Sequence, residues 1–158
     1  MGADKRRDAA AQQAEQKLEQ AIATLRRHPL LAPLMLHLDV HRSRRCPDGA
    51  LAIAYESGSI LLHPTHRAET DEWLWVIAHG ALHFAFGHFQ ARQPAPAWNA
   101  ACDLVVARFL KSLGLGRIPG GAAIPDQPQL RDEQRLFELF RRDGVPKAVA
   151  ALSTAPGR

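Results

Sequence analysis

The segment TDEWLWVIAHGALHFAFG, residues 70–87, decides the fold of this chain. Its charged side chains, Asp71 and Glu72, stand at its beginning, where acidic groups favour the positive end of a helix dipole. Thr70 is a suitable N-cap, and Gly87 stands where a helix would end. The pattern predicts a helix over 71–87. Because aliphatic and aromatic residues occupy nearly every side of it, we expect this helix to be buried in the core.

Two histidines of this segment, His79 and His83, are four residues apart, so both project from the same side of the predicted helix. This spacing lets two imidazoles bind one metal ion. In zinc hydrolases with the motif HExxH, a glutamate follows the first histidine and takes a proton from the metal-bound water. Gly80 stands at that position here and has no side chain. The sequence therefore predicts a metal site that lacks its usual general base.

Such a site needs further ligands, and two candidates lie on or beside the same helix. His88 follows His83 by five residues, about 140° around a helix. It can reach the ion only if the helix unwinds at Gly87. Glu72 lies about 10 Å along the helix from His79, which is too far for both to bind one ion.

Asp103 is the third candidate. A second helix, predicted over 97–113, would bring Asp103 to the two histidines if it packs antiparallel to the first helix. A lone carboxylate in such an apolar run is costly without a cation. The alternative is that Asp103 caps a helix or pairs with Arg108.

The rest of the chain mixes helices with short strands. Apolar spacing and capping residues predict further helices over 3–27 and 132–142. Strands are expected over 50–55 and 60–63, and residues 36–42 alternate loosely. We expect a small antiparallel sheet of two or three strands beside a helical bundle, which is an α+β fold.

Length and composition limit the class of protein. A chain of 158 residues suits one domain. We expect a soluble cytoplasmic protein, because no apolar run is long enough to cross a membrane and the N-terminus lacks a signal sequence. With only two cysteines, Cys46 and Cys102, we do not expect a disulfide scaffold, and we expect Cys102 to be a buried thiol because it lies in an apolar helical run. The net charge of +4 is dispersed over separate clusters, so we do not expect nucleic-acid binding.

Residues 28–144 resemble the bacterial metallopeptidase domain that often precedes a von Willebrand factor A-like domain. The matching motifs occur in order, and their spacing is more specific than HxxxH alone. They are His28-Pro29-Leu30-Leu31, His63-Pro64, Ile77-Ala78-His79-x-x-Leu82-His83, Gly87-His88 and Trp98-Asn99-x-Ala101-x-Asp103. The resemblance divides the chain into an N-terminal helix (1–27), this domain (28–144) and a C-terminal tail (145–158) that is compatible with partial disorder. It implies a zincin-like arrangement.

The resemblance also implies roles for individual residues. His79 and His83 match the metal-binding histidines, and Asp103 matches the aspartate that would be the third ligand. His88 matches a histidine near the site, as an alternative ligand or a group behind the ligands. Trp98 and its neighbour Asn99 match a pair expected to orient the second helix. The implied cofactor is zinc.

Two positions depart from the family pattern. Gly80 replaces the general-base glutamate, and Ala107 replaces a frequent asparagine. No von Willebrand-type domain follows in the sequence, so that partner, or an ATPase partner, would be another chain. We expect a metal-binding, metallopeptidase-like protein with weak or no protease activity. The alternatives are an active zinc-dependent hydrolase that cleaves peptides with another base, such as His88, and a metal-free protein-interaction module with some nucleic-acid affinity.

Overall fold

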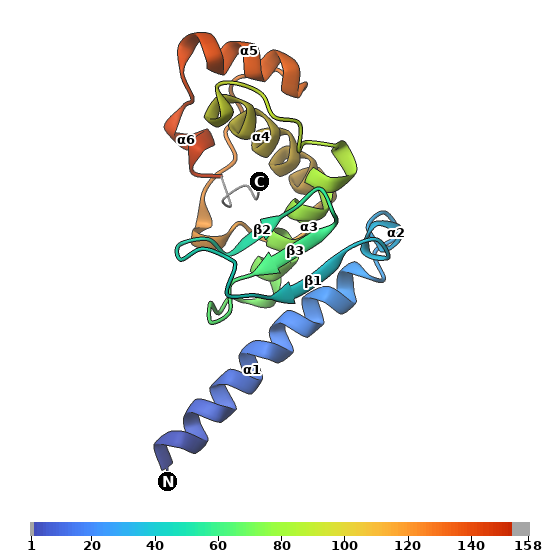
Figure 1. Cartoon of the computed structure of the whole chain (residues 1–158), viewed down its shortest axis with the longest axis vertical. Helices are drawn as coiled ribbons and strands as arrows, with labels where there is room; N and C mark the ends of the chain where they lie inside the picture. Colours follow the sequence, from blue (N-terminus) through green and yellow to red (C-terminus); the bar gives the residue numbers. More distant parts are fainter. Residues whose placement is uncertain (1, 153–158) are drawn as a thin grey trace.

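The computed structural model describes residues 2–152 and has an α+β fold (Figure 1). Between Gly2 and Leu152, six α-helices and a short 3-10 helix accompany one three-stranded sheet. The elements are α1 (Gly2–Leu25), α2 (Ala32–Met35), β1 (Asp39–Arg42), β2 (Ala52–Ala54), β3 (Ser59–Leu62), α3 (Thr70–Phe86), α4 (Ala95–Leu113), η1 (Pro119–Gly121), α5 (Glu133–Asp143) and α6 (Lys147–Ala150). None of the helices between Gly2 and Leu152 combines the length and hydropathy needed to cross a membrane.

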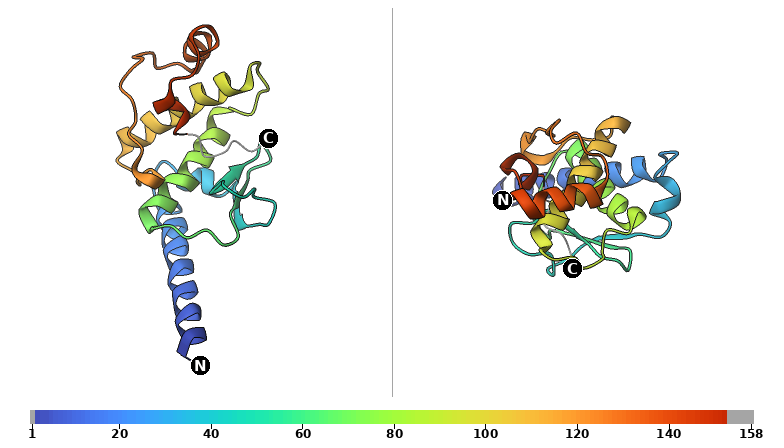
Figure 2. Two further views of the ribbon diagram at one scale, coloured as in Figure 1. Left: turned by 90° about the vertical axis from the view of Figure 1, so that its left-hand side faces the viewer. Right: turned by 90° about the horizontal axis from the view of Figure 1, so that it is seen from above.

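Helix α1 extends away from the rest of the molecule at its N-terminal end (Figures 1 and 2). Only its second half contributes to the core, through Leu18, Ala21 and Leu25. This half packs against α3, and Lys17 forms an ion pair with Glu69 just before α3 begins. The buried side chains of α1 thus cover one side of α3.

The sheet has the strand order β1-β3-β2 and is mixed. Strands β2 and β3 form an antiparallel hairpin, with Ile53 opposite Leu61. Strand β1 pairs parallel to β3, with Val40 opposite Ile60. The expectation of a purely antiparallel sheet was therefore wrong for β1. Alternating apolar residues identify a strand, but they do not determine the direction of its neighbour.

Helix α3 fills the centre of the molecule, and ten consecutive residues from Trp73 to Leu82 are buried. The N-cap is Glu69, one residue before the expected Thr70. The Glu69 amide donates a hydrogen bond of 2.9 Å to the Glu72 carboxylate, which fixes the first turn. This contact also occupies Glu72, far from the histidines.

Helix α4 packs against both α3 and α5, and a long loop joins α4 to α5. The Arg108 guanidinium holds this loop by donating to the carbonyl oxygens of Pro125, Pro128 and Leu130. Beyond α5, Leu152 is buried, so the expected C-terminal tail packs on the core at least that far. The remaining tail, residues 153–158, lies outside the described residues.

Candidate metal centre

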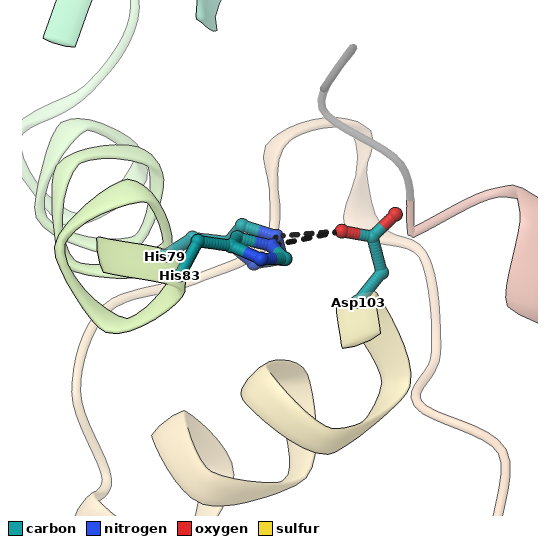
Figure 3. A group of neighbouring side chains, drawn as sticks. All are labelled: His79, His83 and Asp103. Carbon is teal, nitrogen blue, oxygen red and sulfur yellow. Dashed lines mark hydrogen bonds and ion pairs between the residues drawn. The ribbon is translucent and has the colours of Figure 1, made fainter. Parts of the chain in front are cut away.

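Three side chains from two helices meet in the core (Figure 3). His79 and His83 project from α3 toward Asp103 on α4. The two Nε2 atoms are 2.9 Å apart, and each lies 3.0 Å from Oδ1 of Asp103. Within residues 2–152, this is the one group of three or more such side chains whose donor atoms converge. The structure thus brings together the three residues that the sequence singled out as ligands.

Burial determines the charge state of this group. His79 is 1 % exposed and Asp103 is 2 % exposed. Burial lowers the pKa of His79, which favours the neutral imidazole. Burial alone would raise the pKa of Asp103, but hydrogen bonds from His79 and His83 outweigh it and hold that pKa at about 2. The centre therefore combines a neutral His79 imidazole with an ionised Asp103 carboxylate.

This arrangement fits a metal ion. Two imidazole nitrogens 2.9 Å apart repel each other unless a proton or a cation lies between their lone pairs. Oδ2 of Asp103 is buried and has no hydrogen-bond partner among the described residues. A tetrahedral zinc ion with bonds of about 2.0–2.1 Å separates its ligand atoms by about 3.3 Å, so a small outward movement of these side chains would accommodate one. Neutral imidazole and carboxylate are also ligands that zinc accepts.

The other interpretation of Asp103 was wrong. Asp103 lies in the interior of α4, so it caps no helix. Arg108 is bound to carbonyl oxygens of the following loop instead of the Asp103 carboxylate. The carboxylate thus has only the two histidines as hydrogen-bond partners among the described residues.

His88 lies behind His83 rather than beside the other two ligands. Helix α3 ends at Phe86, and Gly87 follows in the left-handed conformation with φ +67°. His88 then turns back, and its Nδ1 lies 3.1 Å from Nδ1 of His83. Burial lowers the pKa of His88 to about 4, with His83 as a further cause. The indole of Trp98 donates to the His88 carbonyl, so Trp98 connects the start of α4 to this turn.

A cavity of about 370 Å³ opens beside the centre. Its walls come from the β2–β3 hairpin, from α3 and α4, and from residues 88–91. Gly80, Asn99 and Cys102 are among the lining residues, together with the three candidate ligands. The cavity gives a second molecule access to the buried histidines.

Gly80 lies on this wall, where α3 faces side chains of β2 and β3. A Cβ atom placed on Gly80 would lie 3.2 Å from Cδ1 of Ile60 and 3.3 Å from Cβ of Ala54. Even alanine would therefore push these neighbours apart by a few tenths of an ångström. Close packing explains why glycine stands in a helix interior, where it costs roughly 0.5–1 kcal/mol relative to alanine.

Sequence reasoning missed two residues of this cavity, Tyr55 and Glu56, in the β2–β3 turn. The available signal was the small residues Ala52 and Ala54 at alternate positions of β2. Small side chains on one face of a strand allow a helix to pack closely there.

One of three comparisons with known proteins found a match. The model of the family described as "Putative metallopeptidase domain" matches residues 13–151. No curated protein matches the chain. No solved structure matches it either. On the extent of the family match, together with the converging HxxxH and aspartate side chains, the chain belongs to this metallopeptidase-like domain family.

Proposed function

We propose that this protein binds one zinc ion through His79, His83 and Asp103 and has little or no peptidase activity. The observation that carries the proposal is the convergence of their three donor atoms to 2.9–3.0 Å beside a cavity. The wall of that cavity has glycine where a peptidase needs its base. The protein would then act as a binding or regulatory subunit.

The chemistry follows from the residues at each position. Zinc supplies a bound water of lowered pKa and a Lewis acid. His79 and His83 offer imidazole nitrogens, and Asp103 supplies the negative charge that favours a divalent cation. Gly80 offers no atom that could accept a proton. A placed general base contributes about 10²–10⁴ in rate, so its loss leaves the binding functions of the site and removes most of its hydrolytic power.

The family resemblance suggests the setting. A von Willebrand factor A-like chain or an ATPase is the partner that we propose, with peptide segments as ligands of the cavity. We also propose a cytoplasmic location. Its support is that Cys46 and Cys102 are both buried as free thiols, which suits a reducing compartment.

The decisive experiment measures zinc per chain by native mass spectrometry on tag-free protein. We expect about one zinc per chain in the wild type and none in His79→Ala, because two remaining donors cannot close the site. His37→Ala removes an exposed histidine and is the matched control, with wild-type zinc content. A wild-type protein that stays metal-free after zinc is added back would contradict the proposal.

A second candidate function is an active hydrolase in which Glu56 replaces the missing base. The observation in its favour is that Glu56 is among the residues that line the same cavity. This candidate predicts zinc-dependent cleavage of peptides by the wild type. Glu56→Gln should then lower kcat by about 10²–10⁴ with unchanged zinc content. Glu19→Gln, at an exposed position of α1, is the control, and full turnover in Glu56→Gln would exclude this role.

A further inference from the structure

The end of α3 returns the chain to His83. The amide of Gly87 donates to the carbonyl oxygens of His83 and Phe84, and the amide of His88 donates to the same His83 carbonyl at 3.1 Å. The positive φ of Gly87 makes this reversal possible. His88 is therefore bound to His83 twice, once through its backbone and once through its side chain.

If Nε2 of His83 binds a metal, the donor and the acceptor of the hydrogen bond between His83 and His88 are determined. A ligating nitrogen uses its lone pair, so a neutral His83 must carry its proton on Nδ1. That Nδ1–H then donates to Nδ1 of His88 across 3.1 Å. His88 must offer a lone pair at Nδ1, and its own proton must lie on Nε2.

The His88 ring is held in place for this contact. The side chain is buried, and the rings of Phe86 and Trp98 meet it edge to face. The Trp98 indole donates to the His88 carbonyl at 3.4 Å, which fastens the residue to α4. His88 is the one hydrogen-bond partner of Nδ1 of His83 among the described residues. Nδ1 of His79, by contrast, has no partner there.

We infer that His88 is a positioning residue that fixes the tautomer and the ring orientation of His83 for metal binding. This inference rests on the proposed zinc site. A hydrogen bond from the non-ligating nitrogen of a histidine is the usual means of orienting it, and its partner is most often a carboxylate, a carbonyl or water. Here the imidazole of His88 is the partner that orients His83. His88 thus supports the site as a fourth side chain but does not itself bind the metal.

The test compares two substitutions at position 88. His88→Leu removes the acceptor, and we expect zinc affinity to fall by about 10- to 100-fold in competition with a chelator. His88→Asn keeps an oxygen near the position of Nδ1, and we expect it to recover most of that affinity. Long-range ¹H–¹⁵N spectra of zinc-loaded wild type should show His83 protonated at Nδ1 and His88 protonated at Nε2.

Each outcome has a separate meaning. If the wild type binds no zinc, the proposed function fails and this inference fails with it. If the wild type binds zinc and His88→Leu binds it equally well, only the inference is overturned. If His88→Leu does not fold, the wild-type spectra still decide, because a proton on Nδ1 of His88 or a zinc bond to His88 overturns the inference.

Discussion

Gly80→Glu is expected to raise zinc-dependent peptide hydrolysis by about 10²–10⁴ over the wild type. The substitution places a carboxylate directly after the first histidine, where it can take a proton from metal-bound water. Turnover of a peptide library by the zinc-loaded variants is the measurement. Gly80→Gln has nearly the same size without the base and is the matched control. If folded, zinc-loaded Gly80→Glu cleaves peptides no faster than Gly80→Gln, the absence of glutamate at position 80 does not explain a low rate of hydrolysis.

The limited space beside α3 at position 80 means that Gly80→Glu needs a compensating substitution in the sheet. The new Cβ would lie 3.2 Å from the end of Ile60, whose flexible side chain can move, and 3.3 Å from Ala54. Ile60→Val shortens the closer neighbour. We therefore expect Gly80→Glu/Ile60→Val to be more stable than Gly80→Glu alone, although each substitution by itself destabilises the protein.

Zinc is expected to raise the melting temperature of the wild type by about 8–16 °C. At a free zinc concentration of 1,000 times Kd, binding to the folded state alone contributes about 4.1 kcal/mol, and each kcal/mol corresponds to about 2–4 °C at this chain length. Calorimetry with zinc and with a chelator measures the shift. The shift should shrink only as the pH falls through the lowered pKa of His79, below the ordinary range of histidine, because imidazoles bind zinc only when deprotonated.

Asp103→Asn is the control for this shift. The substitution keeps the size of the side chain and removes its charge, so we expect zinc to change the melting temperature of this variant little. A full zinc-dependent shift in Asp103→Asn would mean that zinc binds elsewhere on the protein.

The sequence predicted the parts of the site that depend on local geometry. His79 and His83 share a side of α3 because helical spacing alone puts them there. Asp103 was identifiable because an ionised carboxylate among apolar neighbours requires partners. Helix α4 packs against α3 after the loop of residues 87–94, and this packing brings Asp103 to the histidines.

The remaining features depend on contacts that local patterns do not encode. The sequence did not predict the contact of His88 with His83, because a continuous helix would place His88 on another side. In the structure, the left-handed conformation of Gly87 turns the chain back toward His83. Glu56 reaches the cavity only because the β2–β3 hairpin packs on α3. The N-cap is Glu69 rather than the predicted Thr70, because the Glu69 amide donates a hydrogen bond to the Glu72 carboxylate.

The packing around Gly80 also bears on evolutionary history. A Cβ atom at this position would crowd Ile60 and Ala54, which would have to shift by a few tenths of an ångström. If an ancestor carried glutamate there, its return would first have to pass through a crowded, less stable intermediate, or wait for a change in the sheet. The order of substitutions would then matter, because a smaller side chain at position 54 or 60 would have to come before a larger one at position 80.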